Sequence, residues 1–152
     1  MKYTKYSIML PLLVLLGGCN PCQALTDQEI VTLTLLGEAR CQPEEGITAI
    51  AQVILNRSRE RQLSVEVICL QTRQFSCWND RSATFRRSGA LMDESEVATN
   101  TAKALAYAIC NGIDVMPDLK ANHYYNSSLC NPSWAKYGVD TVIIGDHTFI
   151  TL

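Results

Sequence analysis

The chain has 152 residues, of which 47% are hydrophobic, enough for one modest hydrophobic core. Its 13 basic and 15 acidic residues give a formal net charge of −2. This balance falls to −4 without residues 1–24, which contain Lys2 and Lys5 but no acidic residue. A mildly acidic domain without runs of like charge is not expected to bind nucleic acid. We therefore expect a single, monomeric domain that recognises its ligand by shape and hydrogen bonds.

Residues 1–24 have the features of an export signal. Two lysines precede an apolar run, residues 8–16, that is too short to cross a bilayer comfortably as a permanent helix. The sequence Leu16-Gly17-Gly18-Cys19 resembles the lipobox of bacterial lipoproteins, which predicts lipidation of Cys19 and a membrane-anchored, periplasmic protein. Cleavage after Ala24 would instead release a soluble form, and an uncleaved signal anchor would leave the chain in the same compartment.

Seven cysteines in an exported chain indicate an oxidising compartment in which disulfides form. If Cys19 carries lipid, six cysteines remain, and their pairing is not determined by the sequence. The closest pair, Cys69 and Cys77, brackets Gln74 and Ser76. A bridge between these two cysteines would stiffen that loop, and we expect it there.

Helical patterns dominate the first two thirds of residues 25–152. Thr26 and Glu29 form a capping-box pattern that predicts the start of a helix extending towards Ala39. Pro43 is suited to the first position of a second helix, and Asn111-Gly112 is typical of a helix end. Apolar spacing and these signals predict four helices, at residues 26–39, 43–61, 64–70 and 93–110.

The remaining segments predict a loop and a small β structure. Residues 71–91 show no clear period and are expected to form a long functional loop. Residues 141–150 predict a β-hairpin that turns at Gly145-Asp146. Helices first and strands last indicate an α+β fold.

Glu38 is the first candidate for chemistry. It follows an apolar stretch, residues 30–36, and lies close to the expected helix end, where the helix dipole disfavours a bare negative charge. We expect this carboxyl to be buried enough to hold a proton near neutral pH. Such a group can protonate a leaving oxygen.

Seven sequence blocks occur together with Glu38, in a fixed order along the chain. They are Glu38-Ala39-Arg40, Glu45-Gly46, Asn56-Arg57, Gln74-Phe75-Ser76-Cys77-Trp78, His123-Tyr124, Pro132-Ser133-Trp134-Ala135 and Ile144-Gly145-Asp146-His147. In these blocks, residues 30–150 resemble the spore-cortex-lytic cell wall hydrolases of the SleB and CwlJ type. One departure is Cys41-Gln42, where that family commonly has Gly-Glu after its Glu-Ala-Arg block.

This resemblance implies a mainly helical, lysozyme-like or lytic-transglycosylase-like catalytic domain in residues 25–152, with a small C-terminal β-hairpin. It implies peptidoglycan as substrate and Glu38 as the catalytic acid. Side chains able to bind the sugars are Gln74, Ser76, His123, Tyr124 and Asn126. No cofactor or metal is implied.

The reaction type depends on whether a second carboxylate is present. Glu44, Glu45 and Asp80 are weak candidates for a nucleophile, since the first two suit a helix start and the third lies in the loop. A single acid favours lytic transglycosylation between N-acetylmuramic acid and N-acetylglucosamine, with Glu38 acting first as acid and then as base. A muramidase-type hydrolase remains the nearest alternative.

Three alternatives come from other functional classes. A non-catalytic lipoprotein would bind peptidoglycan as a scaffold. A zinc amidase would take its ligands from Glu38, His123 and His147, although no closely spaced pair of histidines supports it. A cysteine peptidase would use Cys77 as nucleophile.

Overall fold

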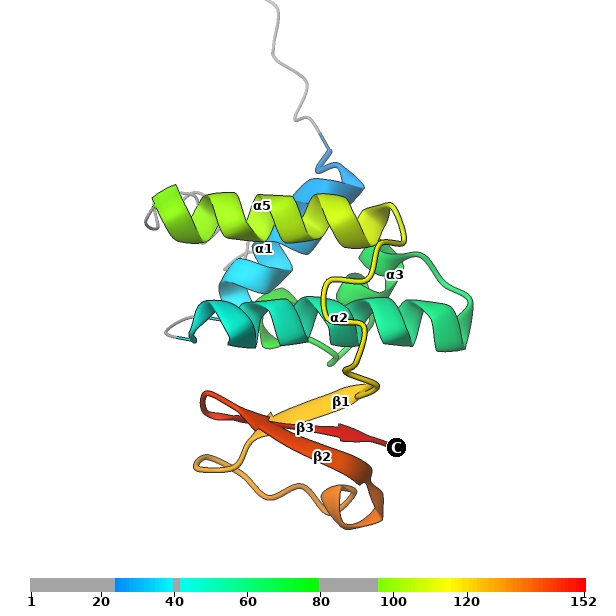
Figure 1. Cartoon of the computed structure of the whole chain (residues 1–152). Helices are drawn as coiled ribbons and strands as arrows, with labels where there is room; N and C mark the ends of the chain where they lie inside the picture. The colour runs from blue at the N-terminus through cyan, green and yellow to red at the C-terminus, as the bar shows by residue number, and fades with distance from the viewer. Residues whose placement is uncertain (1–23, 40–41, 80–95) are drawn as a thin grey trace, which may run out of the picture.

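The computed structural model describes residues 24–39, 42–79 and 96–152, and the helices of this part are stacked on one side of a small antiparallel sheet (Figure 1). Helix α2 lies next to the sheet, and α5 lies on the far side of the helical layer. The helices are α1 (Asp27–Glu38), α2 (Glu44–Arg61), α3 (Val65–Leu70) and α5 (Glu96–Cys110). Two short 3-10 helices, η1 (Ser76–Trp78) and η2 (Ala135–Tyr137), interrupt the loops.

The predicted helices are confirmed with small shifts at their ends. Thr26 and Glu29 form the capping box in both directions, so α1 begins where the sequence pattern places it. Pro43 is the residue before α2 rather than its first helical residue. The last predicted helix is described from Glu96 onwards. Residues 80–91 of the predicted loop, with Asp80, lie outside the described residues.

The sheet has three strands, in the order β1-β3-β2. Strands β2 (Val139–Ile144) and β3 (His147–Thr151) form the predicted hairpin, and Gly145 in its turn has a left-handed φ of 57°. No sequence pattern predicts β1 (His123–Asn126), which pairs antiparallel with β3. This strand has four half-buried residues without hydrophobic alternation, so its strand conformation depends on the pairing with β3.

The core lies where the helices meet one another and the inner face of the sheet. All residues of 31–36 in α1 are buried, because α2, α3 and α5 surround this helix. Phe75 and Phe149 are among the largest fully buried side chains and close the core from the loop and from β3. The packing fixes the C-terminal end of α1, which carries Glu38, between the loop and the sheet.

Among residues 24–39, 42–79 and 96–152, no helix combines the length and apolarity required to cross a bilayer. The predicted signal peptide, apart from Ala24, and the lipidation site Cys19 lie outside the described residues and remain predictions.

The predicted Cys69–Cys77 bridge is not formed in the structure. Cys69 is a free thiol with no exposed surface, and its side chain hydrogen-bonds with Thr34 of α1. Burial raises the pKa of this thiol to about 12. Cys69 therefore acts as a small apolar residue of the core.

Candidate active site

Both carboxylate oxygens of Glu38 accept hydrogen bonds from segments distant in the sequence. Oε1 accepts from Oγ of Ser76 at 3.0 Å and from the backbone N–H of Cys77 at 3.3 Å. Oε2 accepts from the phenol of Tyr124 at 3.3 Å. The end of α1, the helix η1 and the strand β1 therefore meet at one carboxylate.

The surroundings of Glu38 differ from the apolar ones expected from the sequence. The side chain is half-buried rather than buried, and three polar donors contact its carboxylate. The apolar residues 31–36 pack against other helices instead of around the carboxyl group, since Glu38 is the last residue of α1. Glu38 is therefore less buried than the sequence leads us to expect.

Besides the hydrogen bonds of Ser76 and Cys77 to Glu38, one further hydrogen bond and one close contact hold helix η1 against α1. Nε1 of Trp78 donates to Oγ1 of Thr34 at 2.8 Å. On Gly37, a Cβ atom would lie only 2.7 Å from Cβ of Cys77. Only glycine at residue 37 lets η1 approach closely enough for Ser76 and Cys77 to reach Glu38.

Tyr124 approaches Glu38 from the inner face of the sheet. Its ring packs edge-on against His147, with centroids 5.2 Å apart, and lies 5.6 Å from the ring of Phe149. Burial, followed by the charge of Glu38, raises the pKa of Tyr124 well above its ordinary value. The phenol therefore keeps its proton and serves as a donor to the carboxylate.

Arg57 connects the two segments that bring donors to Glu38. Its Nη1 donates to Oε1 of Gln74 at 3.3 Å, and its Nε donates to the carbonyl oxygen of Asn122 at 2.5 Å. The guanidinium also lies 5.7 Å from the ring centroid of Phe75. Burial lowers the pKa of Arg57, but an arginine stays protonated in proteins. Arg57 therefore has a structural role, since it joins the segment before η1 to the segment before β1.

Of the five predicted sugar-binding residues, Ser76 and Tyr124 contact Glu38, and the other three do not. The side chain of Gln74 is bound by Arg57. Asn126 lies on the same face of β1 as Tyr124, but its Oδ1 accepts from the backbone and side chain of Ser128. His123 lies on the opposite face, where its ring packs 5.3 Å from that of Trp134.

The β2–β3 turn docks on Gln42, in the segment between α1 and α2, and no sequence pattern predicts this contact. Nε2 of Gln42 donates to Oδ2 of Asp146 at 3.3 Å, and the backbone N–H of Asp146 donates to Oε1 of Gln42 at 3.2 Å. The next residue, His147, is buried, and its Nδ1 has no hydrogen-bond partner among the described residues. Burial lowers the pKa of His147, whereas the charges of Asp146 and Glu38 act in the opposite direction.

Asp146 is therefore a carboxylate close to the site that the sequence analysis did not consider as a second acid. Its block, Ile144-Gly145-Asp146-His147, carries no sign of an acid near Glu38, because the position of Asp146 depends on the docking of the β2–β3 turn on Gln42.

The structure argues against two of the alternatives, the zinc amidase and the cysteine peptidase. His123 and His147 occupy opposite faces of the sheet, so these two residues do not assemble a site with Glu38. Within the described ranges, no three histidine, cysteine or acidic side chains are grouped to hold a metal ion. Burial and the charge of Glu38 raise the pKa of Cys77 to about 12, so this thiol is not an activated nucleophile.

Comparison with known proteins agrees with the resemblance seen in the sequence. No curated protein matches the chain. Among solved structures, it is similar to the catalytic domain of the germination-specific lytic transglycosylase SleB from Bacillus anthracis, with a TM-score of 0.62 and 24% identity over 86% of this chain and 98% of that one. This similarity confirms the fold, a mainly helical domain with a small C-terminal sheet.

The sequence profile of cell wall hydrolases matches residues 41–150. The matched region includes Ser76 and Tyr124 and begins just after Glu38, so the position of Glu38 beside them rests on the structure. With most of its length matched, the chain belongs to the cell wall hydrolase family.

Proposed function

We propose that the chain cleaves the glycan strands of peptidoglycan between N-acetylmuramic acid and N-acetylglucosamine, as a lytic transglycosylase with Glu38 as its acid and base. Family membership supports peptidoglycan as the substrate and action outside the cytoplasm. The observation that carries the proposal is the cluster in which Ser76, the backbone of Cys77 and Tyr124 all donate to Glu38.

In the first step, the protonated carboxyl of Glu38 gives its proton to the glycosidic oxygen, and the bond from this oxygen to the anomeric carbon of the muramyl residue breaks. The three donors then stabilise the carboxylate that remains, because hydrogen bonds to a charged acceptor are strong.

In the second step, Glu38 takes the proton of the muramyl 6-hydroxyl. The oxygen of this hydroxyl bonds to the anomeric carbon and closes a 1,6-anhydro ring. Because this hydroxyl belongs to the same sugar, its attack is intramolecular and needs neither water nor a nucleophile from the protein. The carboxyl group is again protonated after the second transfer.

Asp146 supports the alternative of a hydrolase with two carboxylates. The charges of Asp146 and Glu38 both act on His147, so both carboxylates lie within electrostatic range of its ring. In a hydrolase, a second carboxylate would activate a water molecule or attack the sugar. However, the side chain of Asp146 is bound by Gln42, which favours a role in fixing the turn.

Mass spectrometry of muropeptides released from purified sacculi tests the proposal. The full chain should yield muramyl ends that are lighter by one water than hydrated ends. Glu38→Gln should fold normally and lose about 10²–10⁴-fold in turnover, since the amide cannot serve as general acid. Asp118→Asn, at an exposed position between α5 and β1, is the control and should remain active.

The other results distinguish the alternatives. Hydrated ends, together with loss of turnover in Asp146→Asn, would establish a two-carboxylate hydrolase. A parent protein that binds sacculi but releases nothing, with Glu38→Gln behaving identically, would indicate a non-catalytic binding protein.

A further inference from the structure

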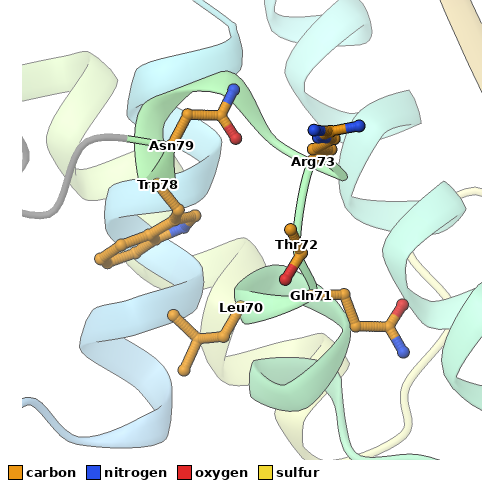
Figure 2. Close-up of a pocket in the computed structure, with 6 residues that line it drawn as sticks. All are labelled: Leu70, Gln71, Thr72, Arg73, Trp78 and Asn79. Atoms are coloured by element: carbon orange, nitrogen blue, oxygen red, sulfur yellow. The ribbon is translucent and has the colours of Figure 1, made fainter.

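A pocket of about 740 Å³ lies between the end of α3 and the end of η1 (Figure 2). Trp78 and Asn79 form one side, and the segment 71–73 forms the other, with Leu70 below them in the view. This volume is within the range of pockets that bind small organic ligands. Nothing in the proposed cleavage reaction uses these side chains.

The pocket is close to Glu38 along α1. Trp78 is the last residue of η1, whose first two residues contact Glu38. Its indole is fixed to Thr34, which precedes Glu38 by one helical turn, about 6 Å along the axis. A group branching from a sugar bound at Glu38 is therefore near enough to enter the pocket.

The described side chains of the pocket carry one charge, which is positive. Among residues 24–39, 42–79 and 96–152, the lining contains Arg73 and no acidic residue. Arg73 is exposed, and no acidic side chain of residues 24–39, 42–79 or 96–152 forms an ion pair with it. The amide of the lining residue Gln71 is held by Arg61, whose Nη1 donates to its Oε1 at 2.5 Å.

The backbone at Arg73 is also unusual, since its φ of 62° lies in the left-handed region that residues with a side chain rarely adopt. The guanidinium is thus presented from a tight turn between α3 and η1. An arginine at such a position is well suited to a planar carboxylate, with which it can form two parallel hydrogen bonds.

We propose that this pocket binds the peptide attached to muramic acid, and that Arg73 binds a carboxylate of that peptide. The inference rests on the proposed function, because it takes peptidoglycan as the substrate. In a peptide-bearing strand the lactyl carboxyl of muramic acid is consumed in the amide bond to the peptide, so the free carboxylates that Arg73 can bind are those of the peptide. Trp78 and Leu70 provide apolar surface for its methyl groups, and Thr72 and Asn79 provide polar groups for its amides.

Binding measurements on the full chain carrying Glu38→Gln test this proposal independently of cleavage. The two ligands are soluble glycan fragments with their peptides attached and, as bare fragments, chitooligosaccharides of matching length, which carry neither peptide nor carboxylate. Arg73→Gln should weaken binding of the peptide-bearing fragments about five- to twentyfold and change binding of the bare fragments by less than about twofold. Arg73→Lys should retain part of the affinity.

Lys103→Gln, which removes an exposed charge from α5, is the matched control and should affect neither ligand. Amidation of the peptide carboxylates should reproduce the effect of Arg73→Gln. Equal weakening of both ligands, or no weakening of either, would overturn the proposal. Failure of the proposed function has a different signature, since the parent chain would then release hydrated ends or no products, whatever the binding measurements show.

Discussion

Arg57 binds Gln74 through its Nη1, and the same side chain binds the carbonyl oxygen of Asn122 through its Nε. Gln74 precedes Ser76 by two residues, and Asn122 precedes Tyr124 by two residues. One buried guanidinium thus fixes both segments whose donors reach Glu38.

Replacement of Arg57 by methionine should reduce both stability and activity. The substitution keeps much of the apolar stem but leaves the Asn122 carbonyl and the Gln74 amide without their donor, which should cost about 2–4 kcal/mol in the free energy of unfolding. Urea denaturation measures this loss. Arg59→Met is the control, because the exposed ion pair of Arg59 with Asp114 should contribute less than about 1 kcal/mol. Equal losses in the two variants would contradict the role of Arg57.

Tyr124→Phe removes one of the donors to Glu38 and leaves the ring in place. We expect turnover to fall about tenfold, less than for an ideal donor, because the hydrogen bond is long at 3.3 Å. Tyr125→Phe is a matched control, since Tyr125 lies on the other face of β1 against Trp134. Steady-state rates on sacculi measure both variants, and a similar loss in Tyr125→Phe would argue against a specific role for the Tyr124 hydroxyl.

Gly37→Ala should damage the protein even though alanine favours helices. A Cβ at residue 37 would lie 2.7 Å from Cβ of Cys77, so η1 must move away from α1 and carry Ser76 away from Glu38. We expect a loss of about 1–3 kcal/mol in the free energy of unfolding, together with reduced turnover. An ordinary helical glycine would instead gain about 1 kcal/mol on this substitution. A more stable, fully active variant would therefore exclude the close contact.

The stability of the protein should fall as the pH falls below about 6.5. Burial lowers the pKa of both histidines, His123 and His147, so the unfolded chain binds protons at a higher pH than the folded chain. The histidine contribution to stability is present above the unfolded pKa and is lost as the pH falls through the folded pKa.

Urea denaturation at several values between about pH 7.5 and pH 5 measures this effect. His147→Gln should show a shallower dependence of the free energy of unfolding on pH than the parent. An unchanged slope would mean that protonation of His147 costs nothing in the folded state.

The sequence alone determined most of the local structure. The capping box at Thr26, the apolar spacing of residues 47–55 and the turn at Gly145 are local signals, and each element formed where it was predicted. The ordered blocks were also sufficient to recognise the family, because they depend on residue types and not on their distances in space.

Tertiary structure decided which of these blocks form the site. Ser76 and Tyr124 reach Glu38, whereas Gln74 and His123 do not. Gln74 precedes η1 and is bound by Arg57. His123 precedes Tyr124 in β1 and therefore lies on the opposite face of the sheet, against Trp134. The strand β1 itself, the docking of Asp146 on Gln42 and the pocket beside Trp78 all depend on contacts between distant segments. Such contacts leave no periodic pattern in the chain, and so only the folded arrangement shows them.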